Sequence, residues 1–329
     1  MFKVPIFFNF SQNIFSIFQM VYFIIGVCLS VSLFVIFRGF NQFKVNMLQA
    51  IVSNYFVCII TGFIFIGDFG VISKISLDKT WVQIAMGMGF VFISTFYLMG
   101  YTAQKVSVTA SSLSSKISLI IPVLFSLLYL NTTQDFGVFR YIGLILVFGA
   151  IILTSIKKKQ ASLQENVESH QQQINDAISP KQAFLLSFLV FILSGFIDLM
   201  MNLVNTKYIT DTTEKALFTI VIFSVAAVIG IVILLIKKEK FELKSLLGGI
   251  VLGVPNFFSI YFMFRALDSF NGNGAIFFPL FNISVIIVSS VASVIIFREK
   301  LNKFNITGLL MAVLAIVFIS FDELKAFFG

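Results

Sequence analysis

The sequence predicts an all-α, polytopic membrane protein whose ten transmembrane helices form an inverted 5+5 repeat. Three observations carry this prediction. First, 58% of the 329 residues are hydrophobic and only 12% are charged, whereas about a quarter of the residues in soluble domains are charged. Second, the apolar residues gather into long continuous runs. Third, a polar segment divides the chain near its midpoint, with five runs on each side.

Each run is long enough to cross a bilayer, because about 20 helical residues span a hydrocarbon core of about 30 Å. A transmembrane β-barrel would show segments of about 10 residues with alternating polarity, so continuous runs favour helices. The first run is longer than the core of a signal peptide, and we expect it to stay in the protein. The ten predicted spans are Ile14–Phe37, Leu48–Gly67, Val82–Tyr101, Ser107–Leu130, Phe139–Ile156, Ala183–Val204, Ala216–Ile236, Leu246–Phe264, Ala275–Phe297 and Ile306–Phe321.

The polar segment Lys157–Lys181 is predicted to be a linker between two domains. It contains three consecutive lysines, a glutamine-rich stretch and a Ser-Pro pair, a composition typical of connecting segments. The first five-helix repeat would then cover residues 1–156 and the second residues 182–329.

The last span of each half carries evidence of duplication. Phe139–Ser155 and Phe304–Ser320 are identical at six of 17 positions when they are aligned at an offset of 165 residues. Because each half has an odd number of spans, the second copy must enter the membrane from the opposite face. Such inverted repeats are the architecture of many secondary transporters. The identical pairs are Phe139/Phe304, Gly143/Gly308, Leu144/Leu309, Ala150/Ala315, Ile151/Ile316 and Ser155/Ser320.

Three stretches resemble the drug/metabolite transporter superfamily, and specifically its EamA-like members. Ala103–Leu130 is similar to the passage between the third and fourth helices of that family, and Gln49–Thr61 to its second helix. Ala275–Leu301 resembles the ninth helix with its terminal Glu, here Glu299, and Phe304–Ser320 resembles the tenth helix with its early glycine, here Gly308. The first copy departs from the pattern, because Gln134 stands where that Glu is expected.

The resemblance implies a carrier for small metabolites, such as amino acids, nucleosides, sugars or drug-like molecules, in the plasma (inner) membrane. It also implies a central cavity between the halves and both termini in the cytoplasm. The distribution of Lys and Arg disagrees, since it favours the linker side as cytoplasmic. The two orientations therefore both stay open.

Lys116 is the strongest candidate for a substrate-binding residue. It lies deep in the fourth predicted span, where a lysine costs about 2.5–3.5 kcal/mol on insertion scales. It could hold a carboxylate or phosphate of a substrate, or it could be a structural lysine that pairs within the bundle. The serines that precede it and Pro122 after it would loosen the helix and let it line water.

Asp198 in the sixth predicted span is the second candidate. Counting 1.5 Å per residue from the linker side places it about 8 Å from the level of Lys116, within reach of an ion pair between the halves. Alternatively, Asp198 binds a substrate amine or takes a coupling proton. Asn202 lies one turn further along the same face.

Other polar residues inside predicted spans are weaker candidates for substrate binding, because hydrogen bonds between helices explain most such residues. Glu299, just after the ninth span, is expected to cap the start of the tenth. The weaker candidates are Asn54, Tyr55, Thr95, Tyr97, Asn256, Tyr261 and Asn282.

The sequence speaks against several other functions. A single histidine and two cysteines exclude a histidine-rich metal site and a disulfide framework. The net charge of +8 comes from basic clusters at span ends, which anchor to lipid head groups and do not resemble a nucleic-acid surface. No nucleotide-binding or catalytic motif is present, so we predict no enzyme and no cofactor. The predicted partners are a small-molecule substrate, the lipid bilayer and a coupling proton or ion. The alternatives are a membrane sensor or scaffold and a lipid-modifying enzyme.

Overall fold

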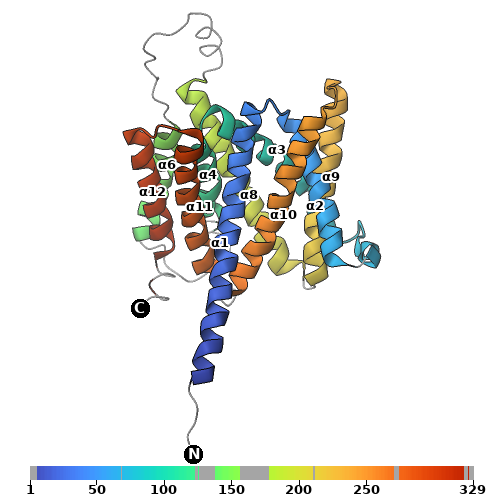
Figure 1. Cartoon of the computed structure of the whole chain (residues 1–329), viewed down its shortest axis with the longest axis horizontal. Coiled ribbons are helices and arrows are strands. Elements are labelled where there is room, and N and C mark those ends of the chain that lie inside the picture. The colour runs from blue at the N-terminus through green and yellow to red at the C-terminus, as the bar shows by residue number, and fades with distance from the viewer. Residues whose placement is uncertain are drawn as a thin grey trace, which may run out of the picture.

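The computed structural model describes residues 6–67, 69–122, 125, 138–155, 178–209, 212–269, 274–321 and 325, and every regular element in these ranges is a helix (Figure 1). The elements are α1 (Ile6–Gln42), α2 (Met47–Ile66), η1 (Phe69–Lys74), α3 (Thr80–Lys105), α4 (Val108–Ile117), α6 (Val138–Ser155), α8 (Pro180–Lys207), α9 (Thr212–Lys237), α10 (Leu243–Ser269), α11 (Gly274–Phe297) and α12 (Lys303–Ile319). The prediction of an all-helical protein is therefore confirmed for these residues.

The helices also have the character of membrane spans. Within the described residues, seven segments are long and apolar enough to cross a bilayer, namely Met20–Gln42, Met47–Ile66, Thr80–Lys105, Pro180–Met201, Ala216–Lys237, Leu243–Leu267 and Phe277–Phe297. Tyr141–Thr154 and Lys303–Ile319 are shorter apolar helices that match the predicted fifth and tenth spans. The protein is thus a helical membrane protein. Most of the predicted linker lies outside the described residues.

Helix starts follow from capping side chains. Asn46, Ser107, Ser179 and Asn302 each accept a backbone N–H from the first turn of α2, α4, α8 and α12, respectively, which satisfies groups that the helix leaves unpaired. The expectation that Glu299 caps the last helix is therefore wrong. Asn302 is closer to that helix in sequence and forms a capping box with Asn305.

The predicted fourth span, Ser107–Leu130, is not one continuous helix in its described part. α4 ends at Ile117 and a turn follows. Pro122 has no N–H to give to the carbonyl of Ser118, and its ring would clash with that carbonyl in a helix. Instead, the N–H of Ile121 donates a hydrogen bond to the carbonyl of Ser118, at 2.9 Å. The proline therefore explains why the helix breaks.

The helices that end the two halves, α6 and α12, pack against each other at one end of the molecule (Figure 1). Their contact uses matching positions of the two predicted repeats. A Cβ on Gly143 would meet Ile319 at 2.7 Å, and a Cβ on Gly308 would meet Thr154 at 2.8 Å. Both pairs of positions are related by the offset of 165 residues. The glycines are needed here because the two backbones approach too closely for any side chain.

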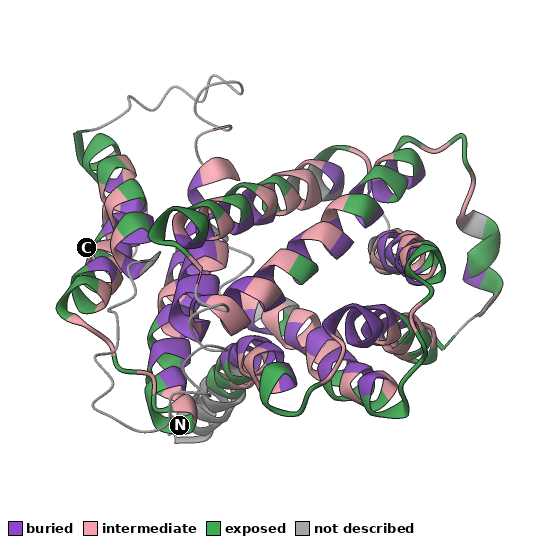
Figure 2. Cartoon of the chain, turned by 90° about the horizontal axis from the view of Figure 1, so that it is seen from above, coloured by how far each residue is buried: buried purple, intermediate pink, exposed green. Residues whose placement is uncertain are grey.

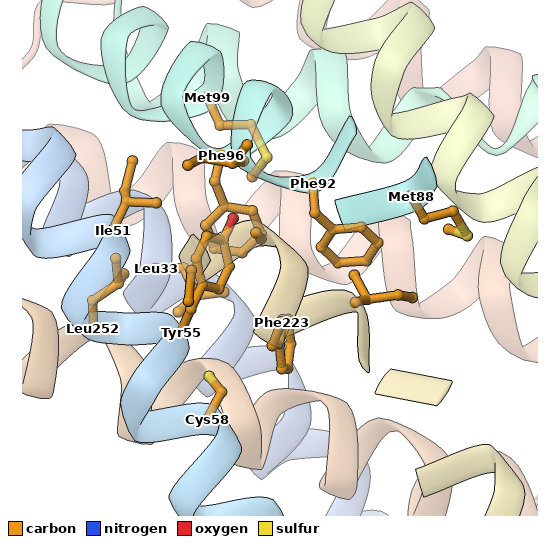
Figure 3. Packing of buried hydrophobic residues seen from close by; sticks show 14 of the residues in the cluster. Leu33, Ile51, Tyr55, Cys58, Met88, Phe92, Phe96, Met99, Phe223 and Leu252 are labelled. Carbon is orange, nitrogen blue, oxygen red and sulfur yellow. The ribbon is translucent and has the colours of Figure 1, made fainter. Parts of the chain in front are cut away.

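Many of the other contacts between the halves come in pairs, in which one contact becomes the other when each helix is replaced by its counterpart in the other half. α2 packs on α10 and α3 packs on α9, whereas α1 packs on α11 and α4 on α8. α1 and α8 run in opposite directions in Figure 1. Buried faces turn inward and exposed apolar faces turn outward (Figure 2), as expected when lipid surrounds the bundle. The core is rich in aromatic rings, with Tyr55, Phe96 and Phe223 packed together (Figure 3).

Candidate functional site

The short helix α4 lies at the centre of the candidate site. Every residue from Val108 to Ser114 is buried, and α4 contacts helices of both halves, including α3, α8 and α11. Lys116 stands in its last turn, next to the break at Ser118. Because the C-terminal end of a helix carries a partial negative charge, this position stabilises the ammonium group.

α4 and α8 run parallel through the site. The hydroxyl of Ser194 donates to the Ser115 hydroxyl at 3.3 Å, and the Ser118 hydroxyl donates to Oδ2 of Asp198 at 3.3 Å. The contacting residues are 79 and 80 residues apart in the sequence, and this nearly constant separation shows that the two helices run in the same direction. Asp198 therefore lies at the level of Ser118, about 3 Å along the helix axis from Lys116, whereas counting residues in the sequence places the two about 8 Å apart.

Asp198 is exposed although it belongs to the inward face of α8. Ser194 and Phe191, which precede it by four and seven residues and so share its face, are 6% and 4% exposed. The outward face is marked by exposed apolar side chains such as Ile192 and Phe196. Asp198 is therefore accessible on the side of α8 that contacts α4.

Lys116 is half-buried beside this carboxylate. Its ammonium lies 5.9 Å from the ring centroid of Phe281 in α11, within the range of a cation–π contact. Asp198 contacts Ser118, two residues further along the chain than Lys116, but among the described residues no ion pair joins Lys116 to Asp198. The two opposite charges are thus neighbours that do not neutralise each other by direct contact.

A ladder of hydroxyl groups joins α4 to α11 beside Lys116. Thr109 and Ser293 lie 3.1 Å apart, and Ser112 and Ser289 lie 2.6 Å apart. As the residue number rises along α4, the number of its partner in α11 falls, so the two helices are antiparallel. Lys116 lies on the same face of α4 as Thr109 and Ser112. Asn282 precedes Ser289 by seven residues and lies on the α4-facing side of α11, where it is 8% exposed.

Asn54 and Asn256 form a separate polar contact between α2 and α10. The Asn256 amide donates to Oδ1 of Asn54 at 3.1 Å, and Cys58 lies 3.5 Å from the same amide nitrogen. All three side chains are buried. Gly253 allows this close approach, since a Cβ there would meet Val57 at 2.7 Å. The pair joins helices and does not line the space beside Asp198.

The remaining predicted residues are scattered. Tyr55 is fully buried between the rings of Phe96 and Phe223. The Thr95 hydroxyl donates to the Val91 carbonyl within α3, at 2.7 Å. Tyr97 is 37% exposed and its ring stacks on that of Tyr101.

Tyr261 lies near the end of α10, where its hydroxyl accepts a hydrogen bond from Nε of Arg265 at 3.1 Å. Asn202 lies in α8 one turn after Asp198, and its side chain is outside what the structure describes. Among the described residues, no group of three His, Cys, Asp or Glu could hold a metal ion.

The sequence analysis missed the partners of α4 on the neighbouring helices. Ser194 in α8 and the pair Ser289 and Ser293 in α11 contact the serine-rich segment directly. The spacing of four residues between Ser289 and Ser293 within an apolar run was visible in the sequence. However, such serines are common in membrane helices, and only the packing reveals which ones meet.

Two known proteins that are similar to this chain carry no description of a function. No family model matches the chain. A protein of Haemophilus influenzae that is described as uncharacterized is 26% identical over 296 residues, which cover 89% of this chain and 95% of the relative. A crystal structure of another protein superposes with a TM-score of 0.55 at 10% sequence identity, covering 94% of this chain and 99% of its own. The chain therefore shares its fold, over nearly its whole length, with a protein of very different sequence.

Proposed function

We propose that this protein is a secondary-active transporter of a small metabolite in the plasma (inner) membrane, working by alternating access. The observation that carries the proposal is the exposed Asp198 on an otherwise buried helix face, beside Lys116 and the break in α4. Ionisable residues inside a membrane bundle typically mark a substrate or ion pathway. Broken helices at this depth are typical of transporter binding sites, because their free backbone groups need water or a ligand.

The packing of the helices supports an inverted repeat of ten spans. The α6–α12 contact joins Gly143 to Ile319 and Gly308 to Thr154, as a two-fold relation between the halves requires. Lys116 and Phe281 are also separated by 165 residues, and they contact each other. Equivalent residues meet in this way only close to a two-fold axis, so such an axis would run through the candidate site. This architecture supports the resemblance to EamA-like transporters.

In this proposal the two charges have different roles. Lys116 would bind an anionic group of the substrate, such as a carboxylate or phosphate. Asp198 would bind a substrate amine or carry the coupling proton. The hydroxyl groups of Ser115 and Ser118, which already contact α8, would supply hydrogen bonds to a ligand bound between α4 and α8.

A thermal-shift screen in detergent tests the proposal, because a ligand that binds only the folded protein raises its melting temperature. The screen should contain amino acids, nucleosides and sugar phosphates. We expect a compound that stabilises the parent protein and does not stabilise Lys116→Ala. The same compound should then be carried across proteoliposome membranes in a saturable manner. A stabilising compound that the reconstituted protein never moves would favour a sensor instead.

For the role of Asp198, uptake is measured with and without a pH gradient. A coupling carboxylate predicts that Asp198→Asn still exchanges labelled for unlabelled substrate but no longer accumulates it against a gradient. An amine-binding carboxylate predicts that exchange is lost as well. Either result assigns the role, and normal accumulation by Asp198→Asn would remove this residue from the mechanism.

A further inference from the structure

Three segments meet at the end of the molecule where α6 ends and α8 begins, which we call the linker side (Figure 1). Arg38 lies one turn before the end of α1, the α3–α4 junction is beside it, and Glu299 follows the end of α11. Nε of Arg38 is 3.8 Å from Oε1 of Glu299, and the two side chains are 25% and 12% exposed. The pair therefore joins the first half of the protein to the second in a largely water-excluded setting.

Each of the two charges also complements the end of a helix. Arg38 donates from Nη1 to the carbonyls of Ala103, at 3.1 Å, and of Gln104, in the last turn of α3. Oε1 of Glu299 accepts the N–H of Val108 in the first turn of α4, at 3.4 Å. Cations favour helix C-termini and anions favour helix N-termini. The α3–α4 junction is thus held from both sides by charges of the appropriate sign.

The backbone before Glu299 turns it toward the bundle. Arg298 has a φ of 51°, in the left-handed region that non-glycine residues rarely adopt. The N–H of Glu299 then donates to the carbonyl of Ser293 in α11, at 3.2 Å. Lys44 after α1 and Lys238 after α9 adopt the same conformation, so this is a left-handed helix ending, and it places Glu299 beside the first turn of α4.

The other end of the molecule lacks the equivalent charges in its sequence. The offset of 165 residues relates Arg38 to Leu203 and Glu299 to Gln134. Leu203 precedes the end of α8 by four residues, just as Arg38 precedes the end of α1 by four, so this alignment places the two in corresponding positions. By sequence the Arg38–Glu299 contact therefore has no counterpart at the other end, where a different ion pair joins the halves, between Nζ of Lys79 before α3 and Oε1 of Glu214 in α9, at 2.6 Å.

We propose that Arg38, Glu299 and the helix ends that they hold form a latch that keeps the linker-side end of the bundle closed. α4 connects this latch to the candidate site, because Val108 and Lys116 lie in the same helix, about 12 Å apart along its axis. Opening of the latch lets the end of α11 move away from α1 and exposes the site to the linker side. The inference rests on the proposed transport function, because only alternating access requires such an opening.

The latch is tested by the distance between spin labels at Gln42→Cys and Lys300→Cys, two exposed positions on either side of it. Cys28 and Cys58, the only cysteines in the sequence, are first replaced by serine. We expect one short distance in the parent protein in lipid nanodiscs, and a longer distance as the major population in Glu299→Gln. In Arg38→Lys, which keeps the charge but loses the two-pronged donor, the distance between the labels should lie between these two values.

The matched control is Glu242→Gln. Glu242 lies just before α10, is paired with Lys244 at 3.3 Å, and is 47% exposed, so its loss should leave the distance unchanged. An unchanged distance in a folded Glu299→Gln protein, with a parent-like melting temperature, would overturn the latch. A charge swap, Arg38→Glu with Glu299→Arg, should fail to restore closure, because both charges would then oppose the helix ends. Full restoration would show that the ion pair acts without them.

A second readout separates this inference from the proposed function. A cysteine at position 115 (Ser115→Cys) reports on the site, and a membrane-impermeant maleimide is added to either side of sealed vesicles. We expect labelling from the side opposite the linker in the parent protein, and from both sides in Glu299→Gln. A cysteine that no variant exposes to either side would contradict the transport pathway, whereas the spin-label distances would still report on the contact at the linker-side end.

Discussion

Two polar regions of this bundle lie at membrane depth, and they differ in what surrounds them. Asn54 and Asn256 meet in a tight interface that glycines make possible, and both are buried. Lys116 and Asp198 both lie near the point where α4 ends, and there Asp198 is exposed. The first region has the features of a structural contact and the second those of a binding site. Residue type alone does not distinguish them, whereas the continuity of the backbone and the exposure of the side chain do.

The largest effect is expected at Lys116. Lys116→Ala should reduce transport at least about 100-fold while the protein stays folded, because the charge that binds the substrate is lost. Uptake into proteoliposomes and the melting temperature measure the two effects separately. The double variant with Asp198→Ala should regain any stability that the single variants lose, since neither charge is then left alone, and should still not transport. Normal uptake by Lys116→Ala would contradict the assignment of the region around Lys116 and Asp198 as a binding site.

The structural interface should respond to added volume. A Cβ on Gly249 would meet the carbonyl oxygen of Ala50 at 2.6 Å, so Gly249→Val forces α2 and α10 apart. We expect a loss of about 2–3 kcal/mol in the free energy of unfolding, as for other overpacked positions, measured by denaturation in mixed micelles. Gly87→Ala is the control, because nothing lies within 4 Å of a Cβ there. Equal stability of the two variants would mean that this interface is looser than described.

Loss of the amide contact should have a smaller effect. Asn256→Ala removes a buried hydrogen bond between helices, which contributes about 1 kcal/mol in membrane proteins. The unfolding free energy should fall by that amount, and the substrate concentration that gives half-maximal uptake should not change. A large change in that concentration at parent-like stability would place Asn256 in the binding site.

The smallest effect is expected in the hydroxyl ladder. Ser112→Ala removes one rung, the contact of 2.6 Å with Ser289. Its replacement should lower the unfolding free energy by roughly 0.6 kcal/mol, the average for such bonds between membrane helices. Transport should slow only slightly, because Lys116 keeps its place at the end of α4. A loss as large as that of Lys116→Ala would mean that the ladder itself contacts the substrate.

The sequence predicts seven helical spans that are confirmed among the described residues, because hydropathy depends on local composition. It also predicts that Lys116 and Asp198 lie within about 8 Å of the same depth, since depth along a helix follows from counting residues. The contact between Asn54 and Asn256 could not be predicted, because rotation of a helix about its axis depends on the neighbours that it meets. The same holds for the serines of α8 and α11.

Glu299 shows how a correct local rule can fail. Its place before α12 favours an N-terminal cap, but Asn302 takes that role. The left-handed turn at Arg298 directs Glu299 to α4, far away in sequence. Pro122 was expected only to loosen the fourth span, yet the helix breaks before it, and the effect of this break on the site depends on the residues that pack beside it.

The contact between α6 and α12 has a consequence for assembly. Since corresponding residues of the two halves close it, each half carries a surface that fits a reversed copy of itself. A five-helix chain with such a self-matching surface can associate with a second molecule in the opposite orientation. A covalent tether between the two copies then fixes their ratio at one to one, and it leaves each copy free to acquire charges that the other lacks.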